Sequence, residues 1–134
     1  MLDVAGRTIL VVEDQTEVRH LISQLLTRGG FRTLEAGDGH EALALIDAFN
    51  TSISLAILDM VLPTMSGLDV AAELQRRHPE IKVLYLSGYA GSIAMDSIQR
   101  RSPEVLLLKP FTEEVLLSRI NGMLGADPKN SPDR

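Results

Sequence analysis

The amino-acid sequence predicts an α/β protein: a flavodoxin-like (βα)5 three-layer sandwich with a five-stranded parallel sheet in the order 2-1-3-4-5. Three observations predict this class. Short apolar runs alternate with helical patterns five times along the 134 residues. Four of the runs are almost wholly apolar, which is typical of strands covered on both faces. The connections between runs and helical patterns are short, as in successive βα units.

The five predicted strands are residues 8–12, 31–36, 55–59, 82–87 and 105–108. The second, "FRTLEA", differs from the others because apolar and polar residues alternate along it. Such alternation indicates a strand with one exposed face, so we place this strand at an edge of the sheet.

The first helix follows the first strand, and its apolar residues recur at the spacing of a single helix face. These residues are Val18, Leu21, Ile22, Leu25 and Leu26. Gly29 and Gly30 predict its end, because glycine is the favoured residue just beyond a helix C-terminus.

Polar residues with the spacing of N-terminal caps predict where three further helices begin. They are Asp38 with Glu41, Ser66 with Asp69, and Thr112. The helix after Ser66 is expected to stop before Pro79.

Apolar residues on these helices predict which faces are buried. The predicted inner faces are Leu45, Ile46 and Phe49 in the second helix, and Leu116, Leu117, Ile120, Met123 and Leu124 in the last. A fourth helix, about residues 92–100, is expected to be marginal because its apolar residues do not share a face.

Length and composition limit the classes of function. We expect one domain, residues 1–125, followed by a polar tail, residues 126–134, that is disordered or the stub of a linker. The sequence contains no cysteine, which excludes disulfides, zinc–thiolate sites and thiol catalysis. A net charge of −5 disfavours nucleic acid as a partner. With neither a membrane-length apolar stretch nor a secretory signal pattern, we expect no membrane contact and a cytoplasmic location.

Acidic residues follow two strands that are neighbours in the predicted sheet order. Glu13 and Asp14 come directly after the first strand, and Asp59 ends the third. The carboxyl ends of neighbouring parallel strands meet in one crevice, so three carboxylates are expected together. Two such charges about 4 Å apart repel by roughly 4 kcal/mol at an effective dielectric constant of 20. A hard divalent cation with oxygen ligands relieves this repulsion, and magnesium (Mg²⁺) suits a small site that keeps several waters.

Two further polar residues end the fourth and fifth strands on the other side of Asp59. Ser87 offers a hydroxyl group and Lys109 an ammonium group. A carboxylate with a cation on one flank and donors on the other is suited to attack an anionic group, of which phosphoryl is the obvious example.

Four segments, "ILVVEDQ", "LAILDMVLPTMSGLDV", "VLYLSGY" and "LLLKPF", occur in this order and at spacings that identify a family. Over about residues 7–124 the chain resembles the receiver domain of two-component response regulators. The resemblance implies that Asp59 accepts a phosphoryl group from a histidine of a histidine kinase or a histidine phosphotransfer domain. The chain would then be a signalling phosphoacceptor, not an enzyme acting on a separate substrate.

The resemblance also implies a role for each site residue. Asp14, Asp59 and the carbonyl group of Val61 would bind Mg²⁺, Glu13 would act largely through water, Ser87 would hydrogen-bond the phosphoryl group, and Lys109 would pair with its charge. The Lys109–Pro110 bond is expected to be cis. The segments "LSGYA" and "DMVLP" look most like receivers of hybrid histidine kinases, but a stand-alone regulator, an output partner and a homodimer stay open.

Three positions differ from the common receiver pattern or bear on phosphoryl lifetime. Leu106 stands where receivers commonly carry an aromatic residue that rotates on activation. Val61 and Tyr89 stand where the family controls access of water to the phosphoryl group. We therefore expect slow self-dephosphorylation, with Tyr89 as the side chain that turns towards phosphorylated Asp59.

Four other classes of function are weighed against the receiver. A receiver-like interaction module without phosphorylation conflicts with the intact acidic residues and Lys109. A metal-dependent phosphatase of the haloacid dehalogenase type would need a second aspartate at position 61, where this chain has Val61. The sequence contains neither a P-loop nor a G-x-G-x-x-G segment, which argues against nucleotide binding. Flavin binding would need a hydroxyl-rich phosphate loop after the first strand, where this chain has acids.

Overall fold

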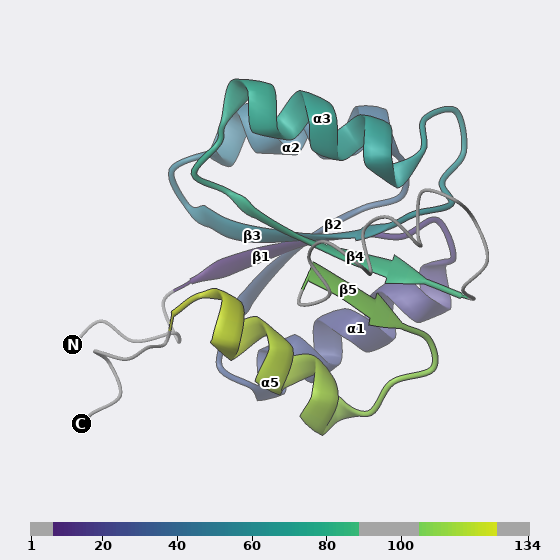
Figure 1. The fold of residues 1–134 in the computed structure, drawn as a ribbon, viewed down its shortest axis with the longest axis vertical. Helices are drawn as coiled ribbons and strands as arrows, with labels where there is room; N and C mark the ends of the chain where they lie inside the picture. The colour runs from purple at the N-terminus through teal and green to yellow at the C-terminus, as the bar shows by residue number, and fades with distance from the viewer. Residues whose placement is uncertain (1–6, 89–104, 126–134) are drawn as a thin grey trace.

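A computed structural model of the protein describes residues 7–88 and 105–125. Within these ranges five parallel strands form one sheet in the order β2-β1-β3-β4-β5 (Figure 1). The strands are β1 Thr8–Val12, β2 Arg32–Ala36, β3 Ile53–Asp59, β4 Lys82–Ser87 and β5 Leu106–Leu108. The predicted fold class and strand order are confirmed, with β2 at an edge.

The helices of the described ranges form the two outer layers. They are α1 Thr16–Arg28, α2 Gly39–Phe49, α3 Gly67–Arg77 and α5 Glu113–Met123. Helices α2 and α3 cover one face of the sheet, and α1 and α5 cover the other (Figure 1). The helix predicted at 92–100 and the tail 126–134 lie outside the described residues. In the described part of the chain, no helix has the length and apolarity needed to cross a membrane.

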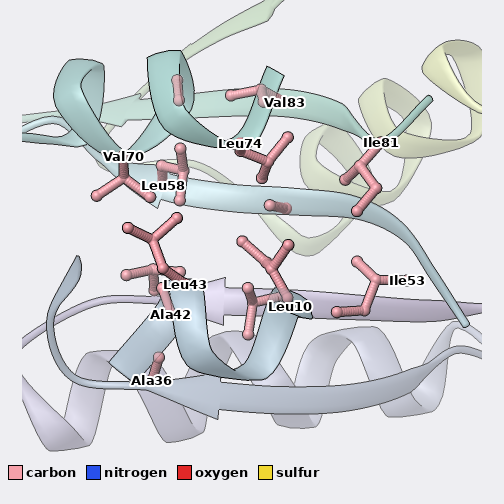
Figure 2. Close-up of a cluster of buried hydrophobic side chains, with 14 residues drawn as sticks. Leu10, Ala36, Ala42, Leu43, Ile53, Leu58, Val70, Leu74, Ile81 and Val83 are labelled. Carbon is pink, nitrogen blue, oxygen red and sulfur yellow. The ribbon is translucent and has the colours of Figure 1, made fainter. Parts of the chain in front are cut away.

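The core consists of two apolar clusters, one on each face of the sheet. Figure 2 shows the first, in which Leu10 and Leu58 of the central strands share one cluster with Val70 and Leu74 of α3. In the second, alternate residues of the same strands pack against α1 and α5. All five residues of β1 are buried, which accounts for its continuous apolar sequence. Each fully buried Leu or Ile contributes about 1.5–3 kcal/mol to folding.

Side-chain caps begin three helices where the sequence predicts them. The Ser66 hydroxyl accepts a hydrogen bond from the Asp69 amide, and the Asp69 carboxylate accepts one from the Ser66 amide. Thr112 caps α5 by accepting a hydrogen bond from the amide of Val115 (3.1 Å).

The cap of α2 follows only half of the predicted pattern. The Asp38 carboxylate accepts a hydrogen bond from the Glu41 amide (2.8 Å). The carboxylate of Glu41 accepts one from the amide of Gly37 (2.8 Å), one residue before the position that a reciprocal capping box would use.

Two apolar residues assigned to inner helix faces are exposed, so those assignments were wrong. The exposed fraction is 54% for Leu21 and 45% for Phe49. Leu21 lies about 100° around α1 from Ile22, at the border of the buried stripe. Phe49 is the last residue of α2, at the end of the helix.

Strand β3 begins two residues before its predicted start at residue 55. The start was missed because the pairing of β3 with β1 is irregular there. Thr8 pairs with Ile53, whereas Ile9 pairs with Leu55. The extra residue, Ser54, interrupts the apolar pattern and makes the first part of the strand look like a loop.

The register of the sheet brings the polar strand ends together. Val12 lies opposite Leu58, so the residues that follow them, Glu13 and Asp59, are neighbours at the carboxyl edge. On the other side of β3, Asp59 lies opposite Leu86 of β4.

Gly67, at the start of α3, lies directly against the end of β3. Its amide donates a hydrogen bond to the carbonyl oxygen of Met60 (3.1 Å). A Cβ atom on Gly67 would collide with the carbonyl oxygen of Asp59 and come within 2.9 Å of Met60 Cα. Because both neighbours are backbone, a larger residue can be accommodated only if the strand end moves.

We predict that Gly67→Ala lowers the free energy of unfolding by about 1–3 kcal/mol, the usual cost of overpacking. Gly122→Ala is the matched control, because a Cβ atom there meets nothing within 4 Å. Gly122 lies in the last turn of α5, so this control should leave stability unchanged or raise it by less than about 1 kcal/mol. Urea unfolding followed by circular dichroism measures both, and a Gly67→Ala variant as stable as the control would contradict the close contact.

Candidate functional site

Glu13 and Asp14 follow β1 in very different environments. Glu13 is 1% exposed, whereas Asp14 is exposed. The Glu13 amide donates a hydrogen bond to the carbonyl oxygen of Ala36 (3.1 Å), which extends the pairing of β1 with β2. One oxygen of the Glu13 carboxylate accepts a hydrogen bond from the amide of Gln15 (3.1 Å). The backbone thus turns around a buried carboxylate.

Asp59 is the last residue of β3 and is also buried. Its Oδ1 atom accepts a hydrogen bond from the amide of Val61 (3.0 Å). Its Oδ2 atom accepts one from the ammonium group of Lys109 (3.0 Å). Its side chain is therefore oriented by one neutral donor and one cation.

Lys109 connects the fifth strand to both buried carboxylates. Its amide donates a hydrogen bond to the carbonyl oxygen of Ser87 (2.8 Å), which continues the pairing of β5 with β4. Its Nζ atom lies 3.0 Å from Asp59 Oδ2 and 3.2 Å from Glu13 Oε1. One ammonium group is thus shared by two carboxylates. The predicted cis bond between Lys109 and Pro110 is confirmed.

The environment of this site raises the pKa values of two of its groups, Glu13 and Lys109. Burial raises the pKa of Glu13 to about 7, and the adjacent Asp59 carboxylate adds to the effect. Burial acts to lower the pKa of Lys109, but hydrogen bonds and charge interactions with Asp59 and Glu13 outweigh it, and the net shift is upward. The ammonium group of Lys109 therefore stays charged, while the raised pKa leaves the carboxyl group of Glu13 partly protonated near neutral pH.

The three predicted acids form one group, named here the acidic cluster: Glu13, Asp14 and Asp59. Each offers a carboxylate oxygen, and these oxygens lie within 4.8 Å of one another. Several carboxylate oxygens at such spacing fit a hard divalent cation. The acidic cluster could therefore hold a metal ion, as the sequence predicts.

An open cavity of about 520 Å³ lies over the acidic cluster. Its lining includes the predicted residues Glu13, Asp14, Asp59, Val61 and Lys109, together with Gln15, Leu62, Pro63 and Gly88. The side chain of Lys109 is partly exposed to it, and Val61 is 74% exposed. A small anion can therefore reach the Asp59 carboxylate from this side.

Ser87 lies at the end of β4, as predicted, but is not among the residues that line the cavity. It is buried, and its carbonyl group accepts the hydrogen bond from the Lys109 amide. Leu106 is buried in β5, and Tyr89 lies outside the described residues. The roles of the Ser87 hydroxyl and of Tyr89 therefore stay predictions.

Sequence reasoning missed Arg19, whose guanidinium group donates a hydrogen bond to the carbonyl oxygen of Glu13 (2.8 Å). A signal was present in the sequence. Arg19 stands near the start of α1, where the helix dipole disfavours a cation. A cation at that position is a signal for some nearby acceptor, but it does not identify the Glu13 carbonyl group as that acceptor.

Comparisons with known proteins agree with this geometry. Residues 9–121 match the family of the response regulator receiver domain. The sensor kinase CckA of Brucella abortus is 32% identical over 123 residues, which cover 91% of this chain and 13% of CckA. The transcriptional regulatory protein CpxR of Klebsiella pneumoniae is 34% identical over 116 residues, covering 87% of this chain and 48% of CpxR. The chain thus spans less than half the length of either relative.

A solved structure shares the fold over most of this chain. The receiver domain of NtrX from Brucella abortus superposes with a TM-score of 0.77 at 32% identity, covering 89% of this chain and 99% of that one. The family match, the strand order and the acidic edge of the sheet lead to one conclusion: the chain belongs to the receiver domain family of two-component response regulators.

Proposed function

We propose that Asp59 accepts a phosphoryl group from a phosphorylated histidine of a histidine kinase or a histidine phosphotransfer domain. The observation that carries this proposal is the position of the Asp59 carboxylate. It lies beside two other carboxylates and 3.0 Å from an ammonium group, in the lining of an open cavity. The family to which the chain belongs supports the same function.

In this reaction a carboxylate oxygen of Asp59 attacks the phosphorus atom. The nitrogen–phosphorus bond breaks as the oxygen–phosphorus bond forms, and the histidine nitrogen leaves with the bonding electron pair. The Val61 amide and the Lys109 ammonium hold the carboxylate in position for this attack. Lys109 can then pair with the charge of the bound phosphoryl group, and Ser87 can donate a hydrogen bond to it.

The acidic cluster fits Mg²⁺, which would supply positive charge to stabilise the negative charge on the phosphoryl oxygens during transfer. Asp14, Asp59 and the carbonyl group of Val61 are the proposed direct ligands, and Glu13 is proposed to act through water. With Lys109 shared between two carboxylates, the cluster has charge left over for a divalent ion.

The same proposal includes the extent of the domain, its cellular location and the kind of protein in which it occurs. Residues 1–125 would form one receiver unit that catalyses only its own phosphotransfer and dephosphorylation in the cytoplasm. One relative is a sensor kinase and another a transcriptional regulator, so a hybrid kinase and a separate regulator are both settings in which such a unit occurs.

We predict that the protein is phosphorylated by acetyl phosphate only when Mg²⁺ is present, and that Asp59→Asn abolishes the labelling. Asp47→Asn is the control, because Asp47 is an exposed acid whose partners are Arg77 and His78 of the α3 end. Intact-protein mass spectrometry measures the added phosphoryl mass. Equal labelling of the two variants would exclude Asp59 as the acceptor, and a parent that never labels would favour a module without phosphorylation.

We predict that Lys109→Met lowers the stability of the metal-free protein by roughly 1–3 kcal/mol, because two buried carboxylates lose a hydrogen-bonded cation. Millimolar Mg²⁺ should restore much of this loss, since a ligand bound only by the folded state stabilises it. Lys82→Met, which removes an exposed lysine of β4, is the matched control. Thermal unfolding with and without Mg²⁺ provides the measurement. The shared ammonium group has no stabilising role if both variants unfold alike.

We predict that Val61→Asn shortens the lifetime of the acyl phosphate several-fold, because an amide group at the mouth of the cavity can orient the attacking water. Val115→Asn is the control, since Val115 is an exposed valine of α5 away from the cavity. The lifetime is measured by loss of the phosphoryl mass after removal of acetyl phosphate. Identical lifetimes in parent and Val61→Asn protein would refute the role given to Val61.

A further inference from the structure

Arg19 links the ends of two neighbouring strands. Its Nη1 atom donates a hydrogen bond to the carbonyl oxygen of Glu13 (2.8 Å), in the loop after β1. Its Nε atom donates one to Oε1 of Glu35 (3.1 Å), in the edge strand β2. The Arg19 side chain is only 17% exposed. One guanidinium group thus bridges the backbone of the acidic loop and a side chain of the adjacent strand.

The bond from Arg19 completes the backbone hydrogen bonding of Glu13. The Glu13 amide already donates to the carbonyl oxygen of Ala36 (3.1 Å). Because Glu13 is 1% exposed, its carbonyl group would be costly to leave without a partner. With both polar groups of its backbone engaged, Glu13 has a defined position, and that position determines where the carboxylates of Glu13 and Asp14 can lie.

The guanidinium group itself is held in place. Besides its two acceptors, it lies close to the segment after β2, because a Cβ atom built on Gly37 would be 3.4 Å from Nη1. Glu35 is further contacted by the ring of His20 (3.3 Å). The planar fork of arginine reaches two acceptors at once, which the single ammonium group of lysine does not reproduce.

We propose that Arg19 is a positioning residue for the cation site, which fixes the acidic loop through the Glu13 carbonyl group so that the acidic cluster is preorganised to bind Mg²⁺. The inference rests on the proposed Mg²⁺-dependent function. Outer contacts that orient metal-binding groups typically account for about 10- to 100-fold in metal affinity.

The sign of the effect separates positioning from simple charge. Arg19 is a cation near a cation site, so its removal should strengthen Mg²⁺ binding if charge alone mattered. Positioning predicts the opposite, a weaker affinity after removal. A purely structural role predicts lower thermal stability with an unchanged dissociation constant.

The test compares Arg19→Met with Arg28→Met in titration calorimetry with Mg²⁺ at constant ionic strength. Arg28 is an exposed arginine of the same helix whose partner is Glu113, remote from the acidic cluster. We expect the dissociation constant to rise about 10-fold in Arg19→Met. It should stay at the parent value in Arg28→Met.

Arg19→Lys and Arg28→Lys repeat the comparison with the charge retained, and they decide the question if Arg19→Met does not fold. Arg19→Lys should bind Mg²⁺ more weakly than the parent, and Arg28→Lys should not. A parent that binds Mg²⁺, with Arg19 variants that bind equally or more tightly, would overturn the inference and leave the proposed function intact. A parent that does not bind Mg²⁺ would overturn the proposed function itself.

Discussion

The sharing of one ammonium group between two buried carboxylates is the constraint on which the functional end of this protein depends. Glu13 and Asp59 approach each other because β1 and β3 are parallel neighbours in register, and Lys109 reaches both from the end of β5. Burial of two like charges is unfavourable without a counter-charge. These charges therefore lower the stability of the fold at one edge of the sheet. Burial of the two apolar clusters on its faces compensates for this loss.

Neutral backbone groups also form hydrogen bonds with these carboxylates. The amides of Gln15 and Val61 donate to Glu13 and Asp59 respectively, and the start of α3 packs directly against the end of β3 through Gly67. Such contacts orient carboxylates without neutralising them, so the acidic cluster keeps negative charge for a cation. This division explains how the fold can be stable and still present the Asp59 carboxylate at an open cavity.

Much of the fold could be predicted because its signals are local. The bounds of β1 and β4 agree with the sequence to the residue, and the caps at Ser66 and Thr112 lie where hydroxyl residues predict them. Periodicity failed at Leu21, because it identifies a helix face but not where contact with the sheet stops. The three acids and Lys109 could be assembled from strand order alone. The contact of Arg19 with the Glu13 carbonyl group could not, because it depends on side-chain reach across a loop.

The central claim, that Asp59 is the phosphoryl acceptor, is tested most directly by locating the modified residue. Protein treated with acetyl phosphate and Mg²⁺ can be reduced with borohydride, which converts an aspartyl phosphate to homoserine, and then mapped by tandem mass spectrometry. The account predicts homoserine at position 59 and at no other aspartate. Homoserine at another position, or a phosphoryl group found instead on a histidine, would contradict it.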